Sequence, residues 1–277
     1  MDDSSTPTVV LTGATSGIGK AAAIGLARHH VALVLLARNP VRAGTLAPDV
    51  RAAGASSLEI VHCDLGLMSS VRTAAAEVKS GHERIDVLVH DASVFLARRE
   101  LTAEGHERMV ATNLLGPFLL TELLTDLLVR AAPSRIITVT APSRLAPRPH
   151  DLESNGRFRA TATFGRTKAA ELMITYALAR RLQGSGVTAN AYHPGVTRTT
   201  GLYREAPLVM KAAGAVLNVA ARTPERAAEG LVDLALSQRF EHTTGRLIHD
   251  GRSIRAPFIE DTAAQEELWA SAAQAAA

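Results

Sequence analysis

The chain has 277 residues, 47% of them hydrophobic, and a formal net charge of +3 from 30 Lys and Arg against 27 Asp and Glu. A chain of this length and composition can bury one large core, so we expect a single domain over residues 1–277. The small net charge, with no basic stripe and no set of stacking aromatic side chains, gives no support for nucleic-acid binding.

Short aliphatic and β-branched runs alternate along the chain with longer helical patterns. Strands are expected at 8–12, 31–37, 57–62, 85–90, 135–140, 187–193 and 245–250, and helices near 17–30, 40–53, 68–81, 103–131, 165–184 and 224–238. Because each parallel return needs a crossover, this alternation predicts an α/β fold, a doubly wound Rossmann-type parallel sheet of about seven strands with helices on both faces.

Two segments interrupt this alternation, at 142–163 and 195–221. Both follow the C-terminal end of a predicted strand, which is where open α/β sheets bind ligands. We expect residues 195–223 to form a substrate lid inserted within the domain, and its apolar stretch 208-LVMKAAGAVLNVAA-221 indicates a partly apolar substrate.

A glycine-rich turn, 12-TGATSGIG-19, joins the first strand to the first helix. Its glycines let the backbone turn tightly and approach a pyrophosphate, while the helix N-terminus supplies unpaired N–H groups and the positive end of a dipole. The sequence therefore predicts a dinucleotide site. Its loop residues are Gly13, Thr15, Ser16, Gly17, Ile18 and Gly19.

The spacing Thr-Gly-x-x-x-Gly-Ile-Gly resembles that of the short-chain dehydrogenase/reductase family. The similarity covers nearly the whole chain and is closest to the retinol-dehydrogenase-like branch. The segments that carry it are 106-HERMVATNLLGPFLLTELL-124, 180-RRLQGSGVTANAYHPGVTRT-199 and 266-EELWASA-272. The resemblance implies an oxidoreductase with a small-molecule substrate, and we expect a homodimer or homotetramer.

The second strand ends 36-LAR-38 and lacks the acidic residue that usually holds the ribose 2′-hydroxyl of NAD. Arg38, with Asn39 after it, is instead placed to meet a 2′-phosphate, so NADP is the expected cofactor. A surface role for Arg38 is the alternative. By position, the family's other cofactor contacts fall on Asp64, Leu65, Asp91, Ala92, Lys168, Pro194, Val196, Thr197 and Thr199.

Only two of the family's four catalytic residues are found in this sequence. In that family a Tyr exchanges the carbonyl proton, a Lys four residues later binds the nicotinamide ribose, a Ser holds the carbonyl oxygen and an Asn sustains a water relay. Asn113 and Lys168 match two of these roles, whereas Phe164 stands at the Tyr position and Ala141 at the Ser position. A general acid typically contributes 10²- to 10⁴-fold in rate, so we expect ordinary carbonyl reduction to be badly impaired.

Few other side chains offer a replacement for the missing hydroxyls. Ser143 is the candidate donor, with a loop role as its alternative, whereas Tyr176 lies about 12 Å farther along the helix and is expected to pack in the core. His62, His90 and Asp91 suggest a metal site only weakly, because the two histidines lie in adjacent strands without a third fixed ligand, so no metal site is expected. The candidate catalytic positions are Asn113, Ser143, Phe164 and Lys168.

Three interpretations of this site stay open. The first is a biosynthetic enzyme that transfers hydride to a partly apolar small molecule without the usual Tyr acid. The second is a non-redox cyclase, isomerase or eliminating enzyme on the same fold, and the third is a non-catalytic NADP(H)-binding protein. A designed Ser-to-Ala and Tyr-to-Phe pair is a further alternative, but the departures from the family pattern at His90, Asp91, Ser93 and Pro142 favour natural divergence.

The location of the protein is predicted from its apolar runs and its N-terminus. The longest unbroken apolar run, 31-VALVLLA-37, is far shorter than the roughly 20 residues that cross a bilayer. The stretch 1-MDDSSTPT-8 has neither a basic nor an apolar region. We therefore expect a cytoplasmic protein without membrane insertion.

Overall fold

The computed structural model describes residues 6–153, 155–156, 158–198 and 221–277, which form one eight-stranded sheet in the order β3-β2-β1-β4-β5-β6-β7-β8. Neighbouring strands are parallel except β7 and β8, which are antiparallel. The strands are β1 (Thr8–Thr12), β2 (Ala32–Ala37), β3 (Ser57–His62), β4 (Val87–His90), β5 (Ser134–Val139), β6 (Val187–Tyr192), β7 (Leu247–His249) and β8 (Arg252–Ile254). The predicted doubly wound α/β fold is confirmed.

The strand β8 was not predicted from the sequence. It has only three residues, and a two-residue turn at Asp250 and Gly251 returns the chain from β7. Both turn residues have positive φ, 49° and 68°, as hairpin turns that match the strand twist require. The parallel sheet therefore gains an antiparallel edge strand.

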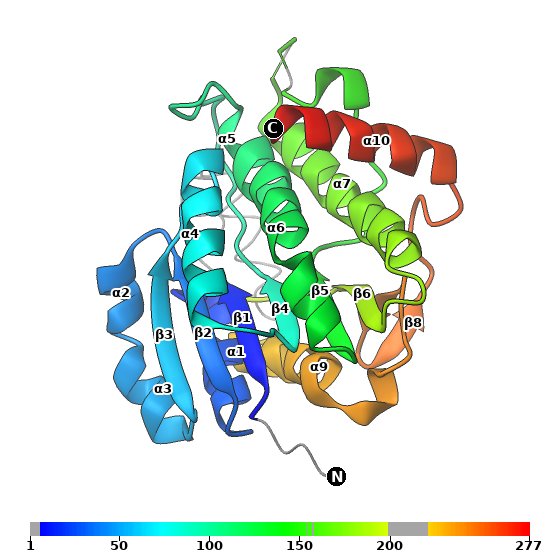
Figure 1. The fold of residues 1–277 in the computed structure, drawn as a ribbon. Helices are drawn as coiled ribbons and strands as arrows, with labels where there is room; N and C mark the ends of the chain where they lie inside the picture. Colours follow the sequence, from blue (N-terminus) through cyan, green and yellow to red (C-terminus); the bar gives the residue numbers. More distant parts are fainter. Residues whose placement is uncertain (1–5, 154, 157, 199–220) are drawn as a thin grey trace.

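Helices cover both faces of the sheet (Figure 1). On one face lie α4 (Met68–Gly81), α6 (Gly116–Arg130) and α7 (Ala160–Arg181), and on the other lie α1 (Gly17–Ala27) and α9 (Pro224–Leu236). Successive side chains of β1 point to opposite faces of the sheet. Val10 packs in the hydrophobic core on the side of α4, α6 and α7, and Val9 and Leu11 pack in the core on the side of α1 and α9. Two cores of similar composition therefore hold the sheet between them.

Several helix boundaries differ from the expected ones. The helix predicted at 40–53 is divided into α2 (Pro40–Gly44) and α3 (Ala47–Ala53), and the second piece begins with a proline among its first two residues. The helix predicted at 103–131 begins with α5 (Arg108–Val110), continues through a π-helical turn (Ala111–Leu115) and joins α6. The helix predicted at 165–184 begins five residues earlier, at Ala160.

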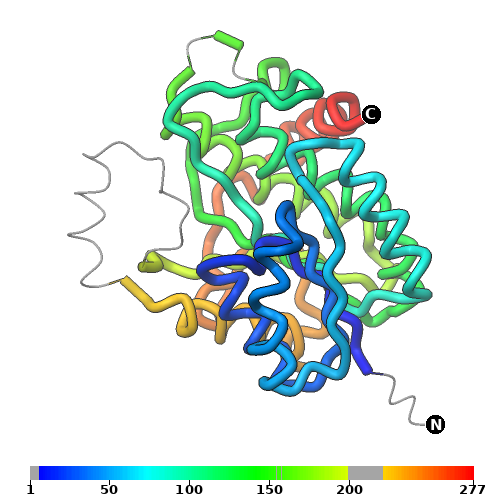
Figure 2. Tube along the Cα trace, turned by 90° about the vertical axis from the view of Figure 1, so that its left-hand side faces the viewer, coloured from blue at the N-terminus to red at the C-terminus, as the bar shows by residue number. Residues whose placement is uncertain are grey.

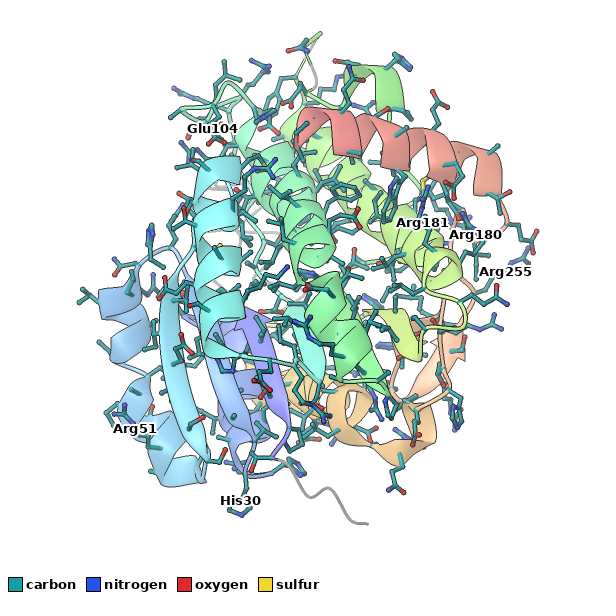
Figure 3. The ribbon with its side chains drawn as sticks, in the orientation of Figure 1. His30, Arg51, Glu104, Arg180, Arg181 and Arg255 are labelled. Carbon is teal, nitrogen blue, oxygen red and sulfur yellow. The ribbon has the colours of Figure 1, made fainter. Side chains whose placement is uncertain are left out.

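The C-terminal helix α10 (Thr262–Ala275) packs along α7. Arg180 and Arg181, labelled near the end of α7 in Figure 3, both pair with Glu266 of α10. The guanidinium of Arg181 also lies 4.3 Å from the ring centroid of Trp269, which in turn packs edge-on against Phe118 of α6. These contacts fix α10 against the two helices that flank the site described next.

Candidate active site

The C-terminal edge of the sheet collects the residues predicted for a dinucleotide site. They follow successive strands: the glycine loop follows β1, Arg38 follows β2, Asp64 follows β3 and Asp91 follows β4. Ser143 lies in the loop after β5, and Pro194, Val196 and Thr197 lie in the loop after β6. Phe164 and Lys168 project from α7, and Asn113 lies in the π-helical turn. Thr199 lies outside the described residues.

The glycine loop is pressed against the segment that follows β4. Gly13 has a φ of +82°, and a Cβ atom there would come within 2.7 Å of the backbone nitrogen of Ala92. A Cβ atom on Gly19 would lie 2.4 Å from the carbonyl oxygen of Gly13. The hydroxyl of Thr12 accepts hydrogen bonds from the backbone nitrogens of Asp91 and Ala92, at 3.1 and 3.2 Å. Both glycines are therefore required by close backbone approach.

The helix α1 begins directly at this loop. Its N-cap residue, Ser16, is extended, and within the described residues its side chain makes no capping hydrogen bond. No acidic residue lies in the first turn of α1. An anionic group placed here would meet the positive end of the helix dipole. Neither Ser16 nor a first-turn carboxylate competes for it, although the N–H of Gly19 is already bonded to the carboxyl of Asp91.

The C-terminal ends of β2 and β3 lie on one side of the glycine loop, because these strands follow β1 in the sheet order. Arg38 is exposed at the end of β2, and the Asn39 side chain caps α2 by accepting the backbone N–H of Arg42 at 2.9 Å. After β3, the Asp64 carboxylate accepts the N–H of Gly66 at 2.9 Å, and Leu65 is buried. The guanidinium of Arg38 thus has solvent access at the point where a ribose phosphate is expected.

Asp91 places a carboxyl group under the glycine loop. One of its oxygens lies 2.5 Å from where a Cβ of Gly19 would stand, and the carboxyl accepts the N–H of Gly19. Burial raises the pKa of Asp91 to about 7, although the nearby ammonium of Lys168 and the N–H of Gly19 act in the opposite direction. The site therefore holds a carboxyl group that changes charge near neutral pH.

Replacing Asp91 by asparagine is expected to remove a pH-dependent loss of stability. In the unfolded chain this carboxyl titrates near 3.8, so between about pH 4 and pH 7 the folded protein binds more protons and its stability falls as pH rises. The loss is complete about one pH unit above 7, where the carboxyl is ionised in both states. We expect the wild type to lose about 2 kcal/mol relative to Asp91→Asn between about pH 5 and pH 8, measured by urea unfolding. The same pH dependence in both proteins would refute this assignment.

The aromatic ring of Phe164 takes the place expected for the catalytic phenol. It packs edge-on against Phe95, with ring centroids 5.6 Å apart and an interplanar angle of 72°. The Lys168 ammonium nitrogen lies 5.4 Å from the centroid of the Phe164 ring, within the range of a cation–π contact. Position 164 therefore faces Lys168 as the sequence predicted, but it offers no proton there.

Lys168 is buried and paired, which the sequence analysis missed. Its ammonium donates to both carboxylate oxygens of Glu171, at 2.9 and 3.1 Å, and the side chains are only 9% and 5% exposed. Burial raises the pKa of the Glu171 carboxyl, while Lys168 acts in the opposite direction. The i,i+3 spacing of Lys168 and Glu171 on one predicted helix was the signal that could have found this pair.

Asn113 organises the strand-end loop after β4. Its side-chain oxygen accepts the N–H of Val94 at 2.8 Å, and its amide donates to the Val94 carbonyl oxygen at 3.0 Å. The same amide donates to the hydroxyl of Thr167 at 3.2 Å, directly beside Lys168 in the chain. Asn113 thus connects the loop to α7.

The other candidate donors are placed differently. The Ser143 oxygen accepts the N–H of Leu145 at 3.3 Å and lies 3.3 Å from where a Cβ of Gly165 would stand. It therefore neighbours Phe164 along α7, and its role as a donor stays a prediction. Tyr176 is 3% exposed in an apolar cluster with Leu172, and burial raises its pKa, as expected for a packing residue.

The segment expected to form a lid is described only at its two ends. Residues 199–220 lie outside the described part of the chain. At the ends, the backbone N–H of Arg198 donates to the carbonyl of Arg222, and the N–H of Arg222 donates to the carbonyl of Val196. Figure 2 shows these two ends side by side. The lid itself stays a prediction.

Comparisons with known proteins identify the family of this chain. The sequence model of the short chain dehydrogenases matches residues 7–207. Human retinol dehydrogenase 13 is 35% identical over 278 residues, covering 96% of this chain and 83% of the relative, and human retinol dehydrogenase 14 is 34% identical, covering 95% and 84%.

Solved structures share the same fold. An uncharacterized protein from Mycobacterium Paratuberculosis superimposes with a TM-score of 0.76 at 26% identity, covering 98% of this chain and 93% of that one. A protein from Beutenbergia cavernae, named as an NAD(P) dependent gluconate 5-dehydrogenase and holding bound NADP, has a TM-score of 0.71 at 26% identity and covers 87% and 94%.

The relatives overturn the expected cytoplasmic location. Retinol dehydrogenases 12, 13 and 14 are known as membrane-associated proteins, so the cytoplasmic expectation is wrong. Among the described residues, one helical stretch, Arg108–Arg130, is long and apolar enough to cross a membrane, and 72% of its apolar window is buried inside the structure. The core helix of a soluble protein passes the same length and composition test, so the correction depends on the relatives.

Proposed function

The chain belongs to the short-chain dehydrogenase/reductase family, in its retinol-dehydrogenase-like branch, and we propose that it transfers hydride between NADP(H) and a partly apolar small molecule without the usual tyrosine acid. The observation that carries this proposal is the Phe164 ring 5.4 Å from the Lys168 ammonium. The lysine that would bind the nicotinamide ribose is present, while Phe164 stands where the family has the tyrosine that exchanges the carbonyl proton.

The missing acid limits the reaction class. A carbonyl that accepts hydride needs a proton on its oxygen, and without a donor this charge develops unassisted. An iminium carbon accepts hydride without needing a proton, and a conjugated carbonyl takes its proton at carbon in a later step from water. Reduction of iminium or conjugated substrates is therefore the chemistry that suits Phe164 and Ala141.

The surroundings of Phe164 support an apolar substrate. Buried Phe95, Leu96 and Met109 form a cluster against which Phe164 and Phe158 pack. The relatives are named retinol dehydrogenases, and retinol is itself a largely apolar molecule. The biosynthetic role and the assembly into a homodimer or homotetramer stay predictions.

NADP(H) is expected to bind more tightly than NAD(H), and Arg38→Asp is expected to remove this preference. Arg38 is the exposed cation at the end of β2, and a charge-assisted contact to the 2′-phosphate is worth about 10- to 100-fold in affinity. Calorimetric titration of both nucleotides into both proteins measures the difference. The matched control is Arg51→Asp at the end of α3, which makes the same charge change elsewhere on the surface (Figure 3). Equal affinities for both nucleotides in the wild type would refute the NADP assignment.

A further inference from the structure

A cavity of about 30 Å³ lies in the layer between the sheet and the helices α6 and α7, and it is lined by Glu171, the ion-pair partner of Lys168. A cavity of this size has room for at least one water molecule. Its lining is unusually polar for a core position. The polar residues that line it include His90, Asn113, Thr121, Thr138, Glu171 and Thr175.

The hydrogen bonds of His90 indicate which ring nitrogen lacks a partner. The Thr121 hydroxyl lies 2.9 Å from the carbonyl of Pro117, which can only accept, so we assign its single hydrogen to that bond and the hydrogen of the 2.7 Å contact with His90 to Nε2 of the ring. His90 is 5% exposed, and burial lowers its pKa to about 4, which keeps the ring neutral. The proton of the neutral ring is therefore on Nε2, and Nδ1 is an acceptor. Among the described residues, Nδ1 has no hydrogen-bond partner.

Glu171 also lines this cavity. Both of its oxygens accept from the Lys168 ammonium, which leaves further lone pairs to accept from a donor in the cavity. Thr175 cannot be that donor, because its hydroxyl donates to the backbone carbonyl of Glu171 at 2.7 Å. His90 and Glu171 thus line one cavity and each keep a buried acceptor with unused capacity, which a molecule with two hydrogens would satisfy.

We propose that a water molecule in this cavity donates one hydrogen to His90 Nδ1 and the other to the Glu171 carboxylate, so that His90 acts through Glu171 to position the ammonium of Lys168. The hydrated site is argued from the hydrogen bonds and the burial of His90 and Glu171, and it does not depend on the proposed function. Its effect on nucleotide binding rests on the proposed function, in which Lys168 holds the nicotinamide ribose. His90 and Glu171 are then positioning residues for Lys168.

Nitrogen-15 NMR of the histidine rings of the wild-type protein tests the hydrated site directly. We expect His90 to carry its proton on Nε2 at pH 7, with Nδ1 shifted as a hydrogen-bonded acceptor and a cross-relaxation peak between water and the ring. Addition of NADPH is expected to shift the Nδ1 resonance. A proton on Nδ1, or a ring that shows no contact with water, would overturn the proposal.

A double-mutant cycle tests the coupling to the cofactor. Glu171→Gln and His90→Leu are each expected to weaken NADPH binding about tenfold, and the double variant is expected to lose no more than about tenfold, because both act on the same ammonium. A double variant weakened about 100-fold would show independent effects and would contradict the coupling. A wild-type protein that does not bind NADPH would instead refute the proposed function, and the NMR result would still decide the hydrated site.

Discussion

Restoring the two missing hydroxyls, in the double variant Phe164→Tyr and Ala141→Ser, is expected to raise reduction of hydrophobic ketones and aldehydes about 10²- to 10⁴-fold. The partners of a tyrosine are already in place. Position 164 faces the Lys168 ammonium, and Asn113 connects the neighbouring loop to α7 through Thr167. A phenol here would therefore lie beside a cation that favours its ionised form.

The control for this gain removes the cation. Adding Lys168→Met to the double variant is expected to abolish the gain, whereas Ala141→Ser alone is expected to give little, because it supplies no acid. Initial rates of NADPH oxidation with a panel of ketones and aldehydes compare the four proteins. If the double variant reduces these compounds no faster than the parent, the pocket has been rebuilt beyond these two positions.

The second large effect is expected at the glycine loop, where Gly19→Ala should weaken NADP(H) binding at least 100-fold. An added Cβ would meet the Gly13 carbonyl oxygen at 2.4 Å and the Asp91 carboxyl at 2.5 Å, which no real contact allows. Because the Gly13 atoms are backbone, the loop itself must move, and overpacking of this kind typically costs about 1–3 kcal/mol of stability. Displacement of the loop also moves the first turn of α1, where the pyrophosphate is expected.

Gly44→Ala is the matched control for that substitution. Gly44 ends α2, and a Cβ atom there would meet nothing within 4 Å. We expect its affinity for NADP(H) to stay within about twofold of the wild type and its stability to be unchanged or slightly higher. Calorimetric titration measures the NADP(H) affinity of both variants, and thermal unfolding measures their stability. Binding by Gly19→Ala at wild-type affinity would show that the nucleotide does not approach this loop.

The sequence predicted the layers of the fold because two strong signals agree along the chain. Aliphatic runs alternate with helical periodicity, and the glycine spacing of 12-TGATSGIG-19 fixes where the first strand becomes a helix. It did not predict β8, since three residues are too few for periodicity to show. It also missed the start of α7 at Ala160, because the preceding residues carry no capping side chain.

The sequence indicated which residues form the candidate site, but not the pKa shifts and hydrogen bonds that their surroundings produce. Lys168, Asn113 and Phe164 were assigned from the resemblance to the family, and the structure brings these three together with the loop after β4. The raised pKa of Asp91 and the hydrogen bond from His90 to Thr121 depend on which side chains surround them after folding. Such surroundings come from contacts between distant segments, for which a single sequence contains no periodic signal.

Transfer of deuterium from the nicotinamide C4 of labelled NADPH to the product is the most direct test of the proposed function. Conjugated and iminium compounds with apolar groups are incubated with the protein and with each of the two C4-labelled stereoisomers of NADPH, and the products are analysed by mass spectrometry. We expect one stereoisomer to deliver deuterium to the product in proportion to the NADPH consumed. Product that forms without the label, and at an unchanged rate when NADP⁺ replaces NADPH, would contradict hydride transfer and favour a non-redox enzyme on the same fold.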